Sequence, residues 1–176
     1  MKIPIAFAFI VLFSTTINAC SKINILVNKT IEKRQIENVC EGKGISNAAE
    51  YPSSSDFHPI YILSDGDQNW NDQLPVEWRH ESIESLELVG CAGQMERKEI
   101  EVCKNILGSY NTRYEYEMKF RLVEAKTGDE VASYTFHGGQ PLPCSPEGIS
   151  PERLFTGSEI TFKDQIEKWL SQYVEY

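Results

Sequence analysis

The sequence predicts an α+β domain in which an antiparallel β-sheet of hairpins packs against a C-terminal amphipathic helix and is stapled by disulfides. Three observations support this. Polar and apolar residues alternate over residues 113–122, apolar residues recur at helical spacing near the C-terminus, and four cysteines are spread over residues 40–144. The chain has 176 residues, 41% of them hydrophobic and 11% aromatic, which is typical of a folded globular domain.

The N-terminus has the pattern of a secretory signal peptide. Lys2 precedes the apolar run Ile3–Phe13, and small and polar residues follow as far as Ala19. The run is too short to span a bilayer, which takes about 20 apolar residues. The predicted organisation is a signal peptide (1–19), an N-terminal lead segment (20–39) and a single α+β domain (40–176).

Cys20 follows the signal directly and allows three interpretations. The stretch "INAC" (Ile17–Cys20) resembles the bacterial lipobox, whose cysteine accepts a lipid. Simple secretion would leave Cys20 as an ordinary N-terminal residue, and a disulfide partner is the third possibility. The chain has five cysteines, and in an exported protein an odd number leaves one over. We therefore expect Cys20 to be lipidated, on a protein of the cell envelope at its periplasmic or outer face, with free secretion as the alternative.

The first half of the domain predicts short elements. Residues 28–40 favour a short helix, and Ile60–Leu63 favour a short buried strand. The segments Leu86–Gly93 and Glu99–Asn105 predict two strands of a hairpin around the polar turn Gln94–Lys98.

The second half contains the clearest patterns. One face of a predicted strand carries Tyr114, Tyr116, Met118, Phe120 and Leu122. Gly128 suits the positive φ of the following turn, and Ala132, Tyr134 and Phe136 alternate on the return strand. The period then changes to that of a helix, whose apolar stripe comprises Phe162, Ile166, Trp169, Leu170 and Tyr173.

The four remaining cysteines predict two disulfides, because an exported chain without a CxxC pair gives little support for a metal or redox cluster. Cys91 and Cys103 lie on the two arms of the first predicted hairpin, so we expect them to pair, which leaves Cys40 with Cys144. Four cysteines allow three connectivities, and the sequence alone does not select one.

Several segments together carry a resemblance. "CEGKGISNAAEY" (Cys40–Tyr51), "LPVEWRHESIESLELVGC" (Leu74–Cys91) and "TFHGGQPLPC" (Thr135–Cys144) occur in that order. The chain resembles a family of uncharacterised bacterial proteins, often cyanobacterial and exported or lipoprotein-like, with four cysteines and a TFxGxxPxPC segment. The resemblance implies one domain with four paired cysteines and implies no activity.

Charge and composition limit the classes of partner that the protein could bind. The net charge of −9 argues against nucleic acid, whose phosphates are bound chiefly by Lys and Arg. The chain has no polybasic segment for anionic lipids, so a membrane would be reached through the lipid on Cys20. We expect no cofactor, and an envelope protein or a glycan as partner. The leading hypothesis is a non-enzymatic binding or interaction domain.

A calcium site is one alternative. Asp65, Asp67, Asn69 and Asp72 offer oxygen ligands in one short stretch, which would suit a calcium-stabilised, adhesin-like domain. Trp70 stands where an EF-hand loop has its sharp-turn glycine, so an ordinary polar turn is the main interpretation.

A small secreted hydrolase is the other alternative, using His137 or His58 with nearby carboxylates. The third histidine, His80, follows Trp78 in a polar segment. No Gly-x-Ser-x-Gly elbow or His-Glu-x-x-His motif accompanies them. A stiff loop pinned by Cys144 is a further binding candidate, or simply a connection to the last helix, and its residues are His137, Gly138, Gly139, Pro141 and Pro143.

Overall fold

The structure, a computed structural model, is a five-stranded mixed sheet with helices at both ends of the chain. It describes residues 32–52, 56–64, 69–104, 108, 110–141, 143–144 and 158–175. A helix covers residues 32–40. The strands are β1 (Ile60–Ser64), β2 (Leu88–Ala92), β3 (Glu96–Lys104), β4 (Tyr110–Glu124) and β5 (Glu130–His137). Three 3₁₀ turns, η2 (Trp70–Gln73), η3 (Val76–Trp78) and η4 (Ile83–Ser85), lie between β1 and β2. The π-helical turn η6 (Phe162–Ile166) leads into the C-terminal helix α2 (Glu167–Val174).

The long strand β4 organises the sheet. One of its edges pairs with β2 over residues 120–124 and with β3 over residues 110–117, so β2 and β3 follow one another along the same edge. Its other edge pairs with β5 over residues 117–123. The hairpin of β4 and β5 confirms the alternation in the sequence, and Gly128 has the expected positive φ of 83°.

Two expectations about the sheet were wrong. The sheet is mixed, because β1 and β2 run parallel. The strands β2 and β3 both exist but do not form a hairpin with one another, since each pairs with β4 instead. The short connection between them therefore continues along one edge of β4 where the sequence pattern suggested a reversal.

The predicted disulfide pairing was wrong for the same reason. The observed bridges are Cys40–Cys91 and Cys103–Cys144. Because β2 and β3 lie end to end, Cys91 and Cys103 are not cross-strand neighbours. Cys91 bonds instead to the end of the helix over residues 32–40, and Cys103 bonds to the chain that follows β5.

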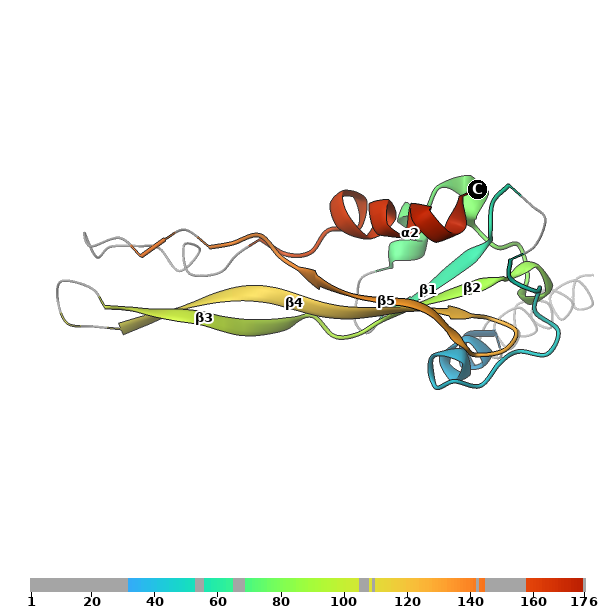
Figure 1. Cartoon of the computed structure of the whole chain (residues 1–176), viewed down its shortest axis with the longest axis horizontal. Coiled ribbons are helices and arrows are strands. Elements are labelled where there is room, and N and C mark those ends of the chain that lie inside the picture. The colour runs from blue at the N-terminus through green and yellow to red at the C-terminus, as the bar shows by residue number, and fades with distance from the viewer. Residues whose placement is uncertain are drawn as a thin grey trace, which may run out of the picture.

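Both faces of the wider end of the sheet are covered (Figure 1). On one face η6 and α2 bury Ile166 and Leu170 against the sheet, as the helical stripe predicted, together with Val174, which the stripe did not include. The sheet residues of this core include Ile60, Leu88, Met118, Phe120, Leu122 and Phe136. We call this wider, three-layered part of the molecule the body.

The opposite face packs on the N-terminal helix. Ile36 and Val39 of this helix are buried against Val89, Cys91 and Val123 of the sheet. The packed fold therefore includes residues 32–39, which the predicted organisation placed in the lead segment before residue 40. The bridge Cys40–Cys91 fixes the end of the helix to β2.

Candidate functional site

The most distinctive feature of the molecule is a two-stranded arm. It consists of β3 and residues 110–117 of β4, and it extends from the body as a narrow ribbon (Figure 1). Among the described residues, β5 reaches β4 only as far as Glu117, so this ribbon has two strands where the body has more. A two-stranded ribbon has little core of its own and needs support to be stable in water.

That support comes from the segment after β5, residues 138–141 and 143–144, which we call the strap. The Gly138 amide donates to the Tyr116 carbonyl oxygen at 2.7 Å. Further along, Arg113 donates to the carbonyl oxygen of Pro141 at 2.6 Å. Arg113 also forms an ion pair with Glu101, and the bridge Cys103–Cys144 fixes the end of the strap to β3. The strap therefore holds the arm through the face on which Arg113 and Cys103 lie.

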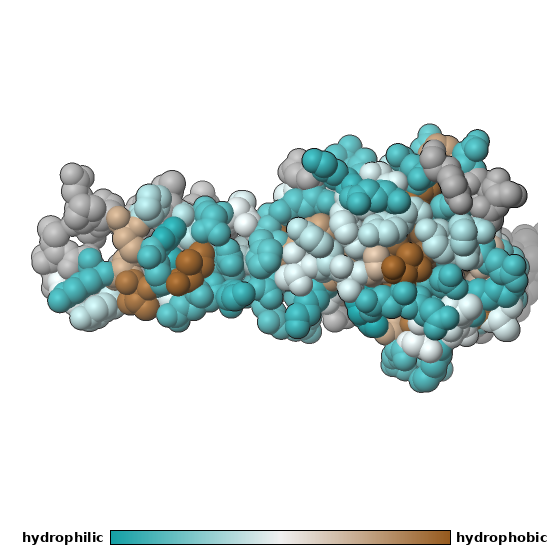
Figure 2. Space-filling model, viewed as in Figure 1, coloured by the Kyte–Doolittle hydropathy of each residue, from teal (hydrophilic) through white to brown (hydrophobic). Residues whose placement is uncertain are grey.

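The other face of the arm is partly exposed and partly apolar. The strand register places Arg97, Glu99, Val102, Lys104, Tyr110, Thr112, Tyr114 and Tyr116 on it, and we call this the aromatic face. Tyr110 is 66% exposed and Val102 is 49% exposed. Ile100, at the β-bulge of β3, is 38% exposed. Lys104 Nζ lies 5.8 Å from the centroid of the Tyr110 ring. Figure 2 shows that apolar surface is present on the arm as well as on the body.

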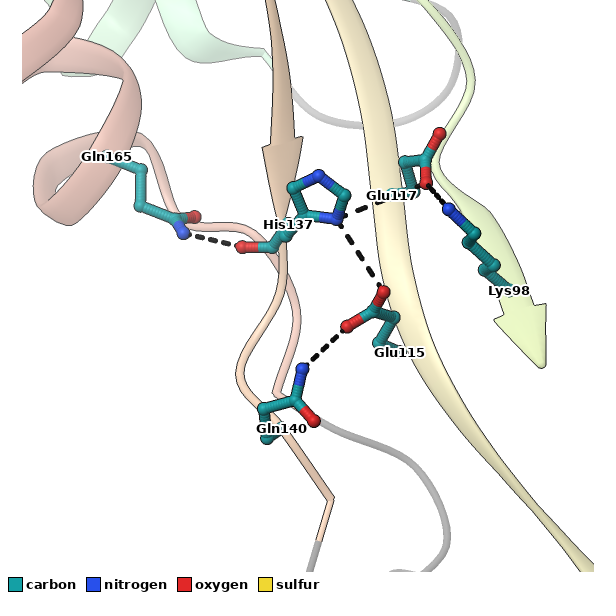
Figure 3. Close-up of polar contacts among 6 residues, drawn as sticks. All are labelled: Lys98, Glu115, Glu117, His137, Gln140 and Gln165. Carbon is teal, nitrogen blue, oxygen red and sulfur yellow. Dashed lines mark hydrogen bonds and ion pairs between the residues drawn. The ribbon is translucent and has the colours of Figure 1, made fainter. Parts of the chain in front are cut away.

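His137 lies at the base of the arm among polar groups that already have partners (Figure 3). Its Nδ1 is 3.7 Å from a Glu115 oxygen and 4.0 Å from a Glu117 oxygen. Glu115 accepts a hydrogen bond from Gln140 of the strap, and Glu117 accepts one from Lys98. The Lys98 ammonium lowers the pKa of Glu117, and Glu117 in turn raises the pKa of Lys98.

This cluster ties segments of the chain together. Besides the Gln140 contact, Gln165 donates to the His137 carbonyl oxygen at 2.6 Å, which joins the turn before α2 to the end of β5. Among the described residues, no hydroxyl or thiol lies within hydrogen-bonding distance of the His137 ring. Within the described ranges, then, no side chain stands beside His137 as the nucleophile of a covalent hydrolase would.

His58 does have a close carboxylate, but the pair is buried. Its Nδ1 is 2.8 Å from a Glu87 oxygen, and the two side chains are 2% and 5% exposed. The Tyr51 ring packs edge-on against the imidazole, with centroids 4.9 Å apart. A substrate cannot reach this pair without opening the core, so the geometry favours a structural role.

The third histidine, His80, lies in a different environment from His58 and His137. The His80 ring packs edge-on against Tyr61 at a centroid distance of 5.4 Å. Burial lowers the pKa of His80, although the charge of Glu32 and a backbone contact with Ile60 oppose this. The structure thus places the three histidines in three separate environments.

The calcium candidates fall partly outside the described residues, since Asp65 and Asp67 are not among them. Asn69 donates to the Asp72 carboxylate at 2.7 Å. Asn71, which the sequence analysis missed, accepts from the Ile62 amide and donates to the Ile62 carbonyl oxygen. It thereby satisfies backbone groups of β1 as a neighbouring strand would, which is the role of an ordinary polar turn.

In the described part of the chain, one group has the spacing of metal ligands: Glu101, Cys103 and Cys144. Both of its sulfurs are joined in a disulfide, so neither is available as a thiolate ligand.

The predicted binding loop coincides with the start of the strap. A Cβ on Gly138 would lie 2.2 Å from the Ser158 carbonyl oxygen, so this glycine permits a close approach of two backbone segments. The Gly139 amide donates to the same oxygen at 2.9 Å. Pro141 offers its carbonyl to Arg113, and Pro143 precedes the bridge at Cys144. Cys20, the predicted lipid acceptor, lies outside the described residues.

A separate groove of about 940 Å³ runs beneath the body, on the sheet face opposite α2. Its floor includes Lys119 and Arg121 of β4 with Ser133 and Thr135 of β5. The helix over residues 32–40 forms one wall through Lys33 and Glu37.

The comparisons with known proteins add no family. No protein-family model matches the chain, and no curated protein and no solved structure is significantly similar to it. The two disulfides are consistent with an extracellular or otherwise oxidising location. None of the helices in the described ranges has the length and apolar character needed to cross a bilayer.

Proposed function

We propose that this chain is an exported, lipid-anchored envelope protein that binds a protein partner through the aromatic face of its arm. The observation that supports this most directly is the exposure of Tyr110, Val102 and Ile100 on a ribbon of two strands. Exposed apolar side chains gathered on a projecting element favour an interface, because isolated folding gains nothing from them.

The support on the other face of the arm favours the same role. The Arg113–Pro141 hydrogen bond and the Cys103–Cys144 bridge order the ribbon before any partner arrives. A preordered surface loses less conformational entropy on association, so more of the contact energy appears as affinity.

The composition of the aromatic face suits a protein surface. Tyrosine and arginine are enriched at protein–protein interfaces, and Arg97, Tyr110 and Tyr114 contribute both kinds of side chain here. Two basic residues and one acidic residue, Glu99, lie among them, which favours a partner patch with a moderate excess of carboxylates.

The position of the anchor is compatible with such a partner. Cys20 precedes the helix over residues 32–40, which lies at the body, and the arm projects from the body at the far end of the molecule (Figure 1). With lipid on Cys20, the arm would lie at the end of the molecule away from the helix that follows the anchor (Figure 1).

Site-specific photo-crosslinking tests this proposal. A photoreactive residue at Tyr110 or Val102 should give a cross-linked product in intact envelopes. The matched control is Val76 in η3 of the body, which is 71% exposed and equally apolar. Products at both arm positions and none at Val76 would support the arm as the interface.

The partner identified in this way then allows an affinity measurement. Val102→Asp and Tyr110→Asp should each weaken binding at least tenfold, whereas Val76→Asp should leave it unchanged. Equal cross-linking at Val76 and the arm, or no product at the arm, would contradict the proposal. A product made of glycan would retain the arm as the site and reject a protein as its partner.

A further inference from the structure

The groove beneath the body places two cations beside two hydroxyl groups. In the register of β4 and β5, Lys119 is paired with Thr135 and Arg121 with Ser133. All four side chains belong to the sheet face opposite the aromatic face of the arm, and all four line the groove. Its volume of about 940 Å³ falls within the usual range of small-molecule sites, roughly 300–1,000 Å³.

The carboxylates near the groove already have cationic partners. Glu41 lies 2.8 Å from Lys43, and Glu37 lies 3.9 Å from Lys33. Arg121 is 3.9 Å from Glu130. Among the described residues, the ammonium of Lys119 has neither an ion pair nor a hydrogen bond. Its charge helps to lower the pKa of Glu117, whose carboxylate is hydrogen-bonded to Lys98. Lys119 therefore leaves a local positive charge that no direct partner neutralises, in a chain whose net charge is −9.

The position of Arg121 is fixed for a reason of its own. Its guanidinium donates to the Cys40 carbonyl oxygen at 2.6 Å, at the end of the helix over residues 32–40. That contact is to a neutral oxygen, so the guanidinium keeps its charge and further donors for a ligand. The Cys40–Cys91 bridge fixes the same carbonyl relative to β2, which makes the groove a preformed site.

We propose that this groove binds a small sugar acid or sugar phosphate. Its anionic group would contact Lys119 and Arg121, and its hydroxyl groups would contact Ser133 and Thr135. Neither of those two side-chain hydroxyls has a hydrogen-bond partner among the described residues, so both remain able to donate and to accept. Leu63 and Ala92 line the same groove and provide apolar contact for a sugar ring.

This proposal is independent of the arm, because the two surfaces lie on opposite faces of the sheet. It is tested on the purified mature chain with both disulfides intact. The probes are glucuronate and glucose 6-phosphate, with glucose as the neutral control and inorganic phosphate as the control for a bare anion. Backbone amide resonances are followed by NMR during titration.

We expect a saturable shift of the amides of residues 119–121 and 133–135 with at least one of the two sugar anions, and no such shift with glucose. Lys119→Gln should weaken this binding about tenfold, because a charged hydrogen bond is lost. Lys168→Gln, which removes an exposed lysine from α2 on the opposite face, should leave the affinity unchanged.

Three results would overturn the inference. One is that neither sugar anion, at millimolar concentration, shifts these amide resonances. Another is an equal loss of affinity in Lys119→Gln and Lys168→Gln, which would indicate only non-specific attraction of charge. The third is equal affinity for inorganic phosphate and glucose 6-phosphate, which would exclude the sugar from the site. Failure of the cross-linking at the arm would change none of these outcomes.

Discussion

The imidazole of His58 and the carboxylate of Glu87 lie 2.8 Å apart in the interior of the body, although 29 residues separate them in the chain. The Glu87 amide also donates to the carbonyl oxygen of Pro59, so the backbone and the side chain join the same two segments. A buried polar pair of this kind contributes to stability only while both members are present.

Removing one member should therefore destabilise the fold. We expect Glu87→Ala to lower the free energy of unfolding by about 3 kcal/mol, because it leaves the imidazole in the core without this partner. Glu87→Gln should cost less, since an amide can still form a hydrogen bond. Chemical denaturation of the variants measures both effects. If Glu87→Ala left the free energy of unfolding unchanged, the pair would have no structural role.

The two disulfides should stabilise different parts of the molecule. Cys40 and Cys91 are 51 residues apart, and the chain-entropy relation gives about 4 kcal/mol for a bridge of that span. Replacing both by serine should lower the global free energy of unfolding by that order. Replacing Cys103 and Cys144 should instead speed amide hydrogen exchange in β3 more than in β2, because this bridge holds the strap to the arm. Equal acceleration in both strands would contradict a local role.

Stability should fall in mild acid because of His80. Burial lowers its pKa below the ordinary value of 6.5. As the pH falls below that value, the unfolded chain binds a proton before the folded chain does, so folding becomes less favourable down to the folded-state pKa. The free energy of unfolding should therefore drop as the pH falls below about 6.5, and less so in His80→Gln. Identical pH profiles for the two proteins would refute the prediction.

Gly138 should resist substitution. A Cβ at this position would lie 2.2 Å from the Ser158 carbonyl oxygen, which is backbone and cannot rotate away. We expect Gly138→Ala to cost about 1–3 kcal/mol, the usual cost of overpacking. Gly93→Ala is the matched control, because its Cβ would meet the Lys119 carbonyl oxygen at the milder distance of 3.1 Å. A larger loss in the control would show that the Ser158 contact is not the limiting one.

The sequence predicted local structure better than strand pairing. The alternation from Tyr114 to Leu122 correctly indicated one face of β4, and the apolar positions at Ile166 and Leu170 correctly indicated the buried side of the last helix. Each of those patterns lies within a single element, so the order of apolar and polar residues directly reflects which side chains are buried.

Pairing between elements could not be obtained in this way. β4 has 15 residues, enough for two strands to pair with it in succession, and nothing local to residues 93–95 shows that the chain continues there instead of turning back. The predicted disulfide pairing rested on the predicted hairpin of β2 and β3, so it was wrong as well. Glu87 was missed because a glutamate between Leu86 and Leu88 predicts a solvent-exposed side chain, and only the fold brings His58 to it.

The cluster at the base of the arm could be predicted in part from the sequence. Strict alternation puts Glu115 and Glu117 on one face, and the predicted hairpin brings the end of β5 opposite Glu117. The contact of Arg113 with Pro141 in the strap could not be predicted from the sequence, because it joins residues 28 apart through a segment without regular structure.

The length of β4 has a mechanical consequence. One uninterrupted strand forms the middle of the body and half of the arm, and the body end of β4 is paired with β2, which the Cys40–Cys91 bridge joins covalently to the first helix. A pull between the N-terminal helix and the arm would therefore pass through the sulfur–sulfur bond into β2, and from β2 both along the chain into β3 and through the backbone hydrogen bonds that pair β2 with β4. A protein tethered at one end and loaded at the other would transmit that tension without unfolding a hinge between its parts.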